Sequence, residues 1–222
     1  GRYPGSLLIA TPYIKPLTTL HGVGAALADK LARLGLNSTF DLLFHLPSRF
    51  EDRTRVTPVY QLRHGQPALV LGAVEGCRVQ FGRRRSLLVS INDSGARFTM
   101  RLFYFNAQQQ RALEQAQWIQ CYGEVRQGAA GLEMVHPEYR VHALEPQDIS
   151  SDTLTPVYPV TEGVTAARIR KLILTVLESE LDQVEELLPQ SLLDSQRLMP
   201  LKDALRTLHT PGPEDDLSAL AE

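Results

Sequence analysis

The stretch of sequence that decides the fold is Arg97-Phe98-Thr99-Met100-Arg101-Leu102-Phe103-Tyr104-Phe105. Alternate side chains of a β-strand point to opposite faces of the sheet, and this stretch divides on that period. One face, which we expect to line a core, carries Phe98, Met100, Leu102 and Tyr104. The other face alternates arginine with threonine and then ends in Phe103 and Phe105.

The arginine-bearing face is an unusual surface to leave in water. Arginine side chains bind phosphates and exposed aromatic rings stack on bases, so this face indicates a nucleic-acid contact. The alternative is a strand that is buried on both faces and has its arginines at the edge, because short apolar runs are ambiguous.

The residues around this stretch predict a small β-barrel. Asp93-Ser94-Gly95 is typical of a hairpin turn that leads into the stretch. The predicted elements are strands over residues 69–79, 85–92, 97–105, 118–125 and 132–141, with one helix over residues 106–117. Three strands, a helix and two more strands is the order of an OB-fold, so residues 61–150 are expected to form a five-stranded OB-fold barrel.

A helical unit is predicted ahead of the barrel, over residues 17–60. Leu20-His21-Gly22-Val23-Gly24-Ala25-Ala26-Leu27-Ala28 resembles a helix-hairpin-helix, in which the backbone N–H groups of Gly22 and Gly24 meet a phosphate at a helix start. The alternative is a helical pair with a structural role only. Gly35 is predicted to end the first helix, and Ser38-Thr39-Phe40-Asp41 to open the next with a capping box.

The remaining segments complete an α+β fold class. Residues 151–222 are expected to form a linker and helices, over 165–188 and 201–208. Residues 1–16 are expected to be a tag or a flexible arm. The C-terminal helix carries its basic residues near its start and its acidic residues near its end, which opposes the helix dipole.

Charge is divided unevenly along the chain. Residues 1–142 hold 17 lysines and arginines against 10 carboxylates, whereas residues 143–222 hold 6 against 15. Arg83, Arg84 and Arg85 form a basic hairpin between the first two predicted strands. Together with Arg97 and Arg101 they are predicted to contact DNA phosphates, and a solvated turn is the alternative.

The aromatic residues Phe103, Tyr104 and Phe105 are the predicted stacking residues. A ring stacked on a base contributes about 1–3 kcal/mol. Docking of these rings against the barrel helix or another domain is the alternative, because exposed apolar patches also mark protein contacts.

The sequence carries no catalytic signature. It has no phosphate-binding loop of the form GxxxxGK[ST], its histidines lack the spacing of a metal site, and we assign no acid, base or nucleophile. No apolar run approaches the roughly 18–20 residues that span a bilayer, so we expect no membrane contact. Cys77 and Cys121 are expected to be reduced thiols in a cytoplasm.

Several segments together resemble the RecG family of ATP-dependent DNA helicases. They are Leu20–Leu31, Asp41–Arg53, Arg101–Asn106, Met134–Tyr139 and Leu154–Gly163. The resemblance implies the wedge domain, an OB-fold that meets the branch point of a replication fork. It matches Phe103 best, and Phe105 second, to an aromatic position that stacks on the terminal base pairs. Where some members place a second aromatic, this chain has Ala107-Gln108.

The resemblance also implies partners and cofactors. Branched DNA, such as forks and Holliday junctions, is the expected partner, together with the motor domains of the full-length protein, in DNA repair and recombination. ATP and Mg²⁺ are expected for those motor domains and no cofactor for this region, which is then no enzyme by itself. The expected location is the bacterial cytoplasm, in association with the nucleoid.

Three functions therefore stand as hypotheses. The first is a module that binds branched DNA and separates its strands by stacking and steric wedging. The second is a scaffold that docks motor domains or partner proteins. The third is a general binder of single strands.

Overall fold

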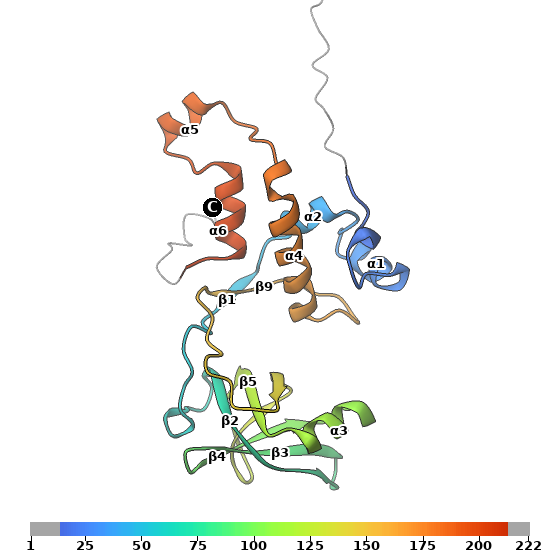
Figure 1. The fold of residues 1–222 in the computed structure, drawn as a ribbon, viewed down its shortest axis with the longest axis vertical. Coiled ribbons are helices and arrows are strands. Elements are labelled where there is room, and N and C mark those ends of the chain that lie inside the picture. The colour runs from blue at the N-terminus through green and yellow to red at the C-terminus, as the bar shows by residue number, and fades with distance from the viewer. Residues whose placement is uncertain (1–13, 213–222) are drawn as a thin grey trace, which may run out of the picture. The chain divides into compact units, whose positions relative to one another are not determined.

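The computed structural model describes residues 14–212, which fold as two compact units (Figure 1). The helical unit combines residues 14–51 with residues 154–212, and the barrel unit spans Asp52–Thr153. The described chain thus passes from the helical unit into the barrel and then returns. We predicted boundaries at residues 60 and 150 and treated the N-terminal and C-terminal helical segments as separate. In the structure those segments share one core.

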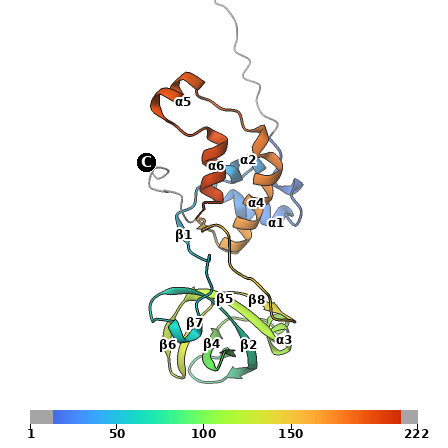
Figure 2. The ribbon, with the colours of Figure 1, turned by 60° about the vertical axis from the view of Figure 1, so that its left-hand side comes forward.

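The barrel unit is built on a seven-stranded sheet with the strand order β6-β7-β4-β3-β2-β5-β8. Its strands are β2 Pro67–Gln80, β3 Ser86–Asp93, β4 Ala96–Leu102, β5 Trp118–Glu124, β6 Arg126–Gly128, β7 Gly131–Val135 and β8 Glu138–His142. The helix α3, Ala107–Gln115, lies between β4 and β5, and a 3₁₀ turn, η2 Val59–Gln61, precedes β2. Figure 2 shows the strands of the sheet curled into a barrel.

The pairing of the strands confirms the OB-fold order. β2, β3 and β4 form an antiparallel meander, β7 runs parallel to β4, and β8 runs antiparallel to β5. The fifth predicted strand is therefore broken at His136-Pro137. Its first half, β7, pairs with β4, and its second half, β8, pairs with β5, which closes the barrel. The short β6 adds a hairpin to β7.

Two local details of the barrel follow from residue type. Ser94 and Gly95 both adopt positive φ angles, of 53° and 92°, which is the geometry of the two-residue turn predicted between β3 and β4. At Gly72, in the long strand β2, an added Cβ would clash with the Ile91 side chain and would lie 2.8 Å from the Asn92 carbonyl oxygen. Glycine is needed there because the strands approach too closely for any side chain.

The alternation predicted for the opening stretch holds up to Leu102. Phe98, Met100 and Leu102 are buried in the barrel core. The prediction for Tyr104 was wrong: its side chain is 72% exposed. The strand ends at Leu102, and the chain then turns toward α3, whose first turn Asn106 caps, so the two-residue period no longer applies.

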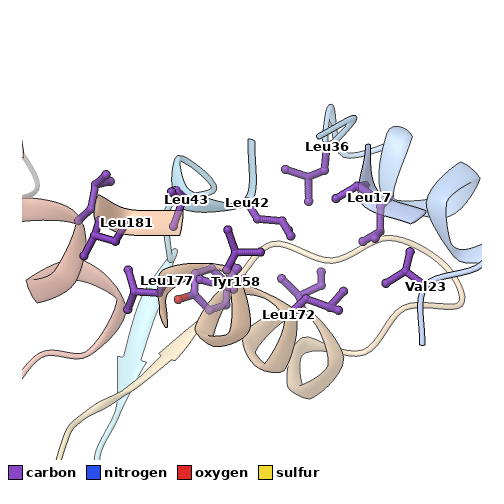
Figure 3. Packing of buried hydrophobic residues seen from close by; sticks show 14 of the residues in the cluster. Leu17, Val23, Leu36, Leu42, Leu43, Tyr158, Leu172, Leu177 and Leu181 are labelled. Atoms are coloured by element: carbon purple, nitrogen blue, oxygen red, sulfur yellow. The ribbon is translucent and has the colours of Figure 1, made fainter. Parts of the chain in front are cut away.

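The helical unit holds the remaining elements. They are η1 Leu17–Thr19, α1 Ala25–Ala32, α2 Thr39–Leu43, β1 Arg49–Glu51, β9 Thr155–Val157, α4 Ala166–Glu180, η3 Leu181–Gln183, α5 Gln190–Gln196 and α6 Leu201–His209. Figure 3 shows side chains from the two ends of the chain, among them Leu17, Leu42 and Leu172, packed in one apolar core. The strands β1 and β9 pair as a two-stranded antiparallel sheet that the sequence analysis did not predict.

The N-terminal part matches the prediction in its caps but not in the helix expected ahead of the glycine turn. Ser38 Oγ accepts a hydrogen bond from the Asp41 N–H, and Asp41 Oδ2 accepts one from the Ser38 N–H, which together form the predicted capping box. Gly35 follows α1 with φ +78°. Between residue 14, where the described chain starts, and the glycine turn, however, the only helical element is the 3₁₀ turn η1. Of the predicted arm over residues 1–16, only residues 14–16 are described; the Lys15 carbonyl accepts a hydrogen bond from the Thr39 N–H at 2.9 Å.

The long C-terminal helix is shorter than predicted. We expected a helix over residues 165–188, but α4 ends at Glu180, η3 follows, and Leu188 is exposed. Carboxylates gather where the helix ends, next to the negative end of its dipole, and this arrangement disfavours further turns. Glu180 itself is buried and lies 3.5 Å from Lys15 Nζ.

Candidate nucleic-acid interface

The turn between β2 and β3 and the segment after β4 meet at one end of the barrel. β3 lies between β2 and β4 in the sheet, and Leu87 pairs with both Val79 and Leu102. The chain that follows β2 therefore lies next to the chain that follows β4. This register brings Arg83–Arg85 and Phe103–Phe105 together, although about 20 residues of sequence separate them.

The contacts between these two segments are guanidinium groups over aromatic rings. The Arg84 Cζ lies 4.2 Å from the centre of the Phe103 ring and 4.8 Å from that of Tyr104, and Arg85 Cζ lies 4.4 Å from that of Phe105. Such cation–π pairs are attractive, and the arginines keep their N–H donors free to turn toward an anion. We call residues 81–85 and 103–105 together the arginine–ring cluster.

The three aromatic rings differ in how much of each is exposed to solvent. Tyr104 is exposed, whereas Phe103 is partly buried and Phe105 is partly buried against the barrel core. Phe105 therefore serves the core as well as the surface, in line with the alternative of docking. Phe103 and Tyr104 are the rings that lie together under one arginine.

His136, which lies between β7 and β8, bonds to the segment that follows β4. Its Nε2 accepts hydrogen bonds from the backbone N–H groups of Phe103, at 3.0 Å, and Tyr104, at 3.4 Å. Its ring stacks on that of Tyr104 with 5.6 Å between centroids. Burial first, and then the positive charge of Arg84, lower the pKa of His136 below its ordinary value of 6.5.

Of the two strand arginines, Arg101 borders the arginine–ring cluster, with its Cζ 5.9 Å from the centre of the Phe103 ring, whereas Arg97 lies apart from it. Arg101 Nε lies 3.0 Å from Glu133 Oε2, and its Nη1 donates to Ser86 Oγ at 2.9 Å. Those bonds commit Arg101 to joining β3, β4 and β7. Arg97 lies near the other end of β4, where its exposed side chain is 3.5 Å from Glu75.

Phe81 is a candidate that the sequence analysis missed. It lies at the tip of the β2–β3 hairpin, directly before Gly82 and the three arginines, and its side chain is 80% exposed. An aromatic residue beside a run of arginines in a hairpin turn is a readable signal, but the prediction weighed only the charges. Phe81 adds a fourth ring to the cluster.

The glycine turn belongs to the helical unit. Gly22 has φ +78°, and its carbonyl oxygen accepts a hydrogen bond from Arg168 Nη2 at 2.7 Å. Gly24 occupies the N-cap position of α1, without a side chain to cap the helix. The contact of Gly22 and Gly24 with a phosphate stays a prediction.

The opposite end of β3 offers a contrasting surface. A hollow of about 320 Å³ lies there, lined among others by Tyr60, Trp118, Asp93 and Glu145. It also presents aromatic rings, but its charged side chains are acidic and repel phosphate. Within residues 14–212 no three metal-ligating side chains converge, and none of the helices described is long and apolar enough to cross a membrane.

Comparisons with known proteins identify relatives of this chain. A family model described as the RecG wedge domain matches residues 16–179. The chain is 47% identical over 206 residues to the ATP-dependent DNA helicase RecG of Escherichia coli O127:H6, and 41% identical over 210 residues to that of Haemophilus influenzae. These matches cover 92% and 93% of this chain but only 29% and 30% of the relatives.

One solved structure shares the fold. It is that of a RecG bound to a three-way DNA junction, and it matches with a TM-score of 0.71 at 23% sequence identity. The match covers 90% of this chain and 27% of the other.

Proposed function

We propose that this chain, which belongs to the RecG wedge domain family, binds branched DNA and separates its strands at the junction. The observation that carries the proposal is the arginine–ring cluster, where Arg84 and Arg85 lie over the rings of Phe103, Tyr104 and Phe105. The related protein whose structure contains a three-way DNA junction supports the choice of branched DNA over other nucleic acids.

The chemistry of the cluster suits a branch point. Arg83, Arg84 and Arg85 neutralise backbone phosphates, and turning a guanidinium toward a phosphate uncovers the ring face beneath it. The uncovered faces of Phe103 and Tyr104 then stack on the last base pair before the branch, at about 1–3 kcal/mol per base. A packed barrel behind these rings keeps the two strands from pairing again.

The residues near the arginine–ring cluster have different roles in the proposed site. Phe81 and Arg83, at the tip of the hairpin, reach the DNA first, and Phe103 with Tyr104 form the stacking surface. Arg101 supports the site from within, through Glu133 and Ser86. Arg97 contributes a weaker phosphate contact at the far end of β4.

The whole protein is proposed to be an ATP-dependent DNA helicase of repair and recombination. This chain spans less than a third of the length of its RecG relatives. Motor domains outside the chain bind ATP and Mg²⁺ and pull duplex against the wedge, and this chain supplies no catalytic group. We place that activity in the bacterial cytoplasm, at the nucleoid.

A second candidate function is docking of those motor domains, and one observation favours it. In the helical unit, the segment over residues 187–199 leaves several large apolar side chains exposed. They are Leu187, Leu188, Leu192, Leu198 and Met199. Exposed apolar side chains gathered in one segment are typical of protein contacts.

Binding measurements on three DNAs test the proposed function. A fork, a duplex and a single strand of equal length are titrated with the full chain across a series of salt concentrations. We expect the fork to bind most tightly and all affinities to fall as salt rises. Equal affinity for the three DNAs would contradict the wedge, and tightest binding to the single strand would favour the general binder of single strands. Absence of salt-dependent binding would favour the docking function.

A further inference from the structure

His136 occupies the break in the strand that closes the barrel. β7 ends one residue before it, and β8 begins two residues after it. Its backbone N–H donates to the Arg101 carbonyl oxygen at 2.9 Å, while its ring Nε2 accepts from the N–H groups of Phe103 and Tyr104. One residue thus bonds the end of β4 and the aromatic segment that follows it.

The backbone of His136 is held in an uncommon conformation. Its φ is +48°, in the left-handed region that residues with a side chain rarely adopt, and a proline follows it. Pro137 packs against Gly123 of β5 so closely that an added Cβ on that glycine would lie 3.2 Å from the Pro137 Cβ. Strained conformations persist where their surroundings fix them, and they gather at functional sites. Here the conformation turns the ring out of the strand and toward Phe103 and Tyr104.

The two hydrogen bonds define the state of the ring. A nitrogen that accepts from two N–H groups carries no proton, so the neutral ring bears its proton on Nδ1. A protonated ring has no acceptor, and it leaves the N–H groups of Phe103 and Tyr104 without their partner. The ring also stacks on Tyr104 and lies 6.2 Å from the Phe103 ring, between centroids, so its position affects both.

We propose that His136 is a positioning residue of the DNA site: its unprotonated Nε2 fixes the orientation of the Phe103 and Tyr104 rings, and protonation of the ring releases them. The DNA readout of this inference rests on the proposed function, whereas its structural readout does not. The predicted consequence is that binding to forked DNA weakens as acid protonates His136.

The charged groups around His136 decide whether its ring is neutral or protonated at neutral pH. Arg84, from the turn between β2 and β3, opposes protonation, and burial does so more strongly. Arg101 of β4 is paired with Glu133 of β7, and Glu138 of β8 lies 2.9 Å from Arg53. The neighbouring carboxylates are therefore engaged with arginines, and His136 is neutral at neutral pH.

Nuclear magnetic resonance of the DNA-free full chain tests the structural part. We expect the imidazole ¹⁵N shifts to show the proton on Nδ1 at neutral pH. We also expect the amide shifts of Phe103 and Tyr104 to follow the titration of His136, and their hydrogen exchange to slow less on acidification than base-catalysed chemical exchange does. A proton on Nε2 at neutral pH, or amide shifts that ignore the titration, would overturn the proposal whether or not the chain binds DNA.

Two substitutions test the binding part. Gln at position 136 keeps an acceptor near the place of Nε2 and does not titrate, whereas Phe keeps a ring and removes the acceptor. We expect His136→Gln to bind forks within about twofold of the unsubstituted chain at pH 7, and His136→Phe to bind about tenfold more weakly, because one acceptor for two donors is lost. Acidification should weaken binding by the unsubstituted chain and leave His136→Gln almost unchanged.

The matched control is His64. Its Nδ1 accepts a hydrogen bond from the Gln127 N–H at 3.0 Å, in the same barrel but with no contact to the three rings in the part of the chain described. His64→Phe should therefore leave fork binding and its pH profile as they are. Fork binding by His136→Phe that equals that of the unsubstituted chain would overturn the proposal. So would affinity that rises on acidification, because it would show that the histidine acts only through its charge.

Discussion

The helical unit and the barrel unit each contain a histidine whose ring bonds to backbone, and the two differ in what the ring holds. In the helical unit, His209 Nε2 donates to the Leu43 carbonyl oxygen at 2.7 Å, and its Nδ1 accepts from the Tyr158 hydroxyl at 2.7 Å. All of these groups are buried in the core. In the barrel unit, His136 bonds to a segment whose rings reach the surface.

This difference separates stability from binding. Buried hydrogen bonds from α6 to α2 and to Tyr158, the residue after β9, join segments from the two ends of the chain and contribute to the free energy of unfolding. A bond to the segment that carries Phe103 and Tyr104 sets the direction of rings that a ligand can reach. The same imidazole chemistry thus stabilises one unit and prepares a surface in the other, and substitutions should tell the two apart.

The largest expected effect lies in the helical unit. His209→Ala leaves the Tyr158 hydroxyl and the Leu43 carbonyl buried without partners and should lower the free energy of unfolding by about 3 kcal/mol. Circular dichroism follows this unit, and fluorescence of Trp118, the single tryptophan, follows the barrel. We expect the helical transition to shift further than the Trp118 transition.

The control for that substitution is His45→Ala. His45 bonds to the Pro159 carbonyl at 3.0 Å but is only partly buried, so its removal should lower the free energy of unfolding by about 1 kcal/mol. Equal shifts of both transitions in His209→Ala would show that the hydrogen bonds of His209 do not stabilise the helical unit more than the barrel unit.

The next effect lies in the arginine–ring cluster. Replacing Arg83, Arg84 and Arg85 together by glutamine should weaken fork binding on the order of 100-fold at low salt and reduce the slope of log affinity against log salt by about 2. The thermal transitions should stay in place, because these side chains are exposed.

Arg97→Gln serves as the comparison for the triple replacement. Arg97 is equally basic but lies at the far end of β4 beside Glu75, so we expect its loss to change the slope by less than about 1. A larger effect of Arg97 than of the three turn arginines would move the site to the other end of the barrel.

A smaller effect is expected for the rings. Phe103→Ala should weaken fork binding about tenfold and single-strand binding less, since stacking on one base contributes about 1–3 kcal/mol. Tyr60→Ala removes a more exposed ring, at the acidic end of β3, and should change neither. Matching losses for Phe103→Ala and Tyr60→Ala would indicate that the ring contacts are unspecific.

The smallest effect is a pH dependence of the helical unit. Burial lowers the pKa of His209 below its ordinary value of 6.5. Its contribution to stability is therefore complete above pH 6.5 and is lost as the pH falls through the lowered pKa of the folded state. We expect the helical transition to move to lower temperature on acidification, and His209→Ala to lack that part of the shift.

Local patterns allowed much of the fold to be predicted. The Ser38–Asp41 capping box, the turn at Ser94-Gly95 and the buried face of β4 each depend on residues a few positions apart, where side-chain chemistry acts directly on the backbone. The order of strands and helix then indicated the OB-fold. The pairing of β1 with β9 was not predictable, because two three-residue strands about 100 positions apart carry no local signal.

The site was predictable in composition but not in contacts. The arginines and rings were read from the sequence, yet only the register of β2, β3 and β4 shows which arginine covers which ring. The break at His136 was hidden inside an ordinary strand pattern. The exposed position of Tyr104 depends on where β4 ends, which the alternation of apolar residues did not reveal.

Mapping of the contact surface tests the central claim most directly. Amide and side-chain resonances of the full chain are followed as a forked DNA is added at low salt. We predict that the shifts change most at Phe81, Arg83–Arg85 and Phe103–Phe105, with little change at Tyr60 and Trp118. Changes confined to the turn at Gly22–Gly24, with none at the arginine–ring cluster, would contradict the assignment of the DNA site to this end of the barrel.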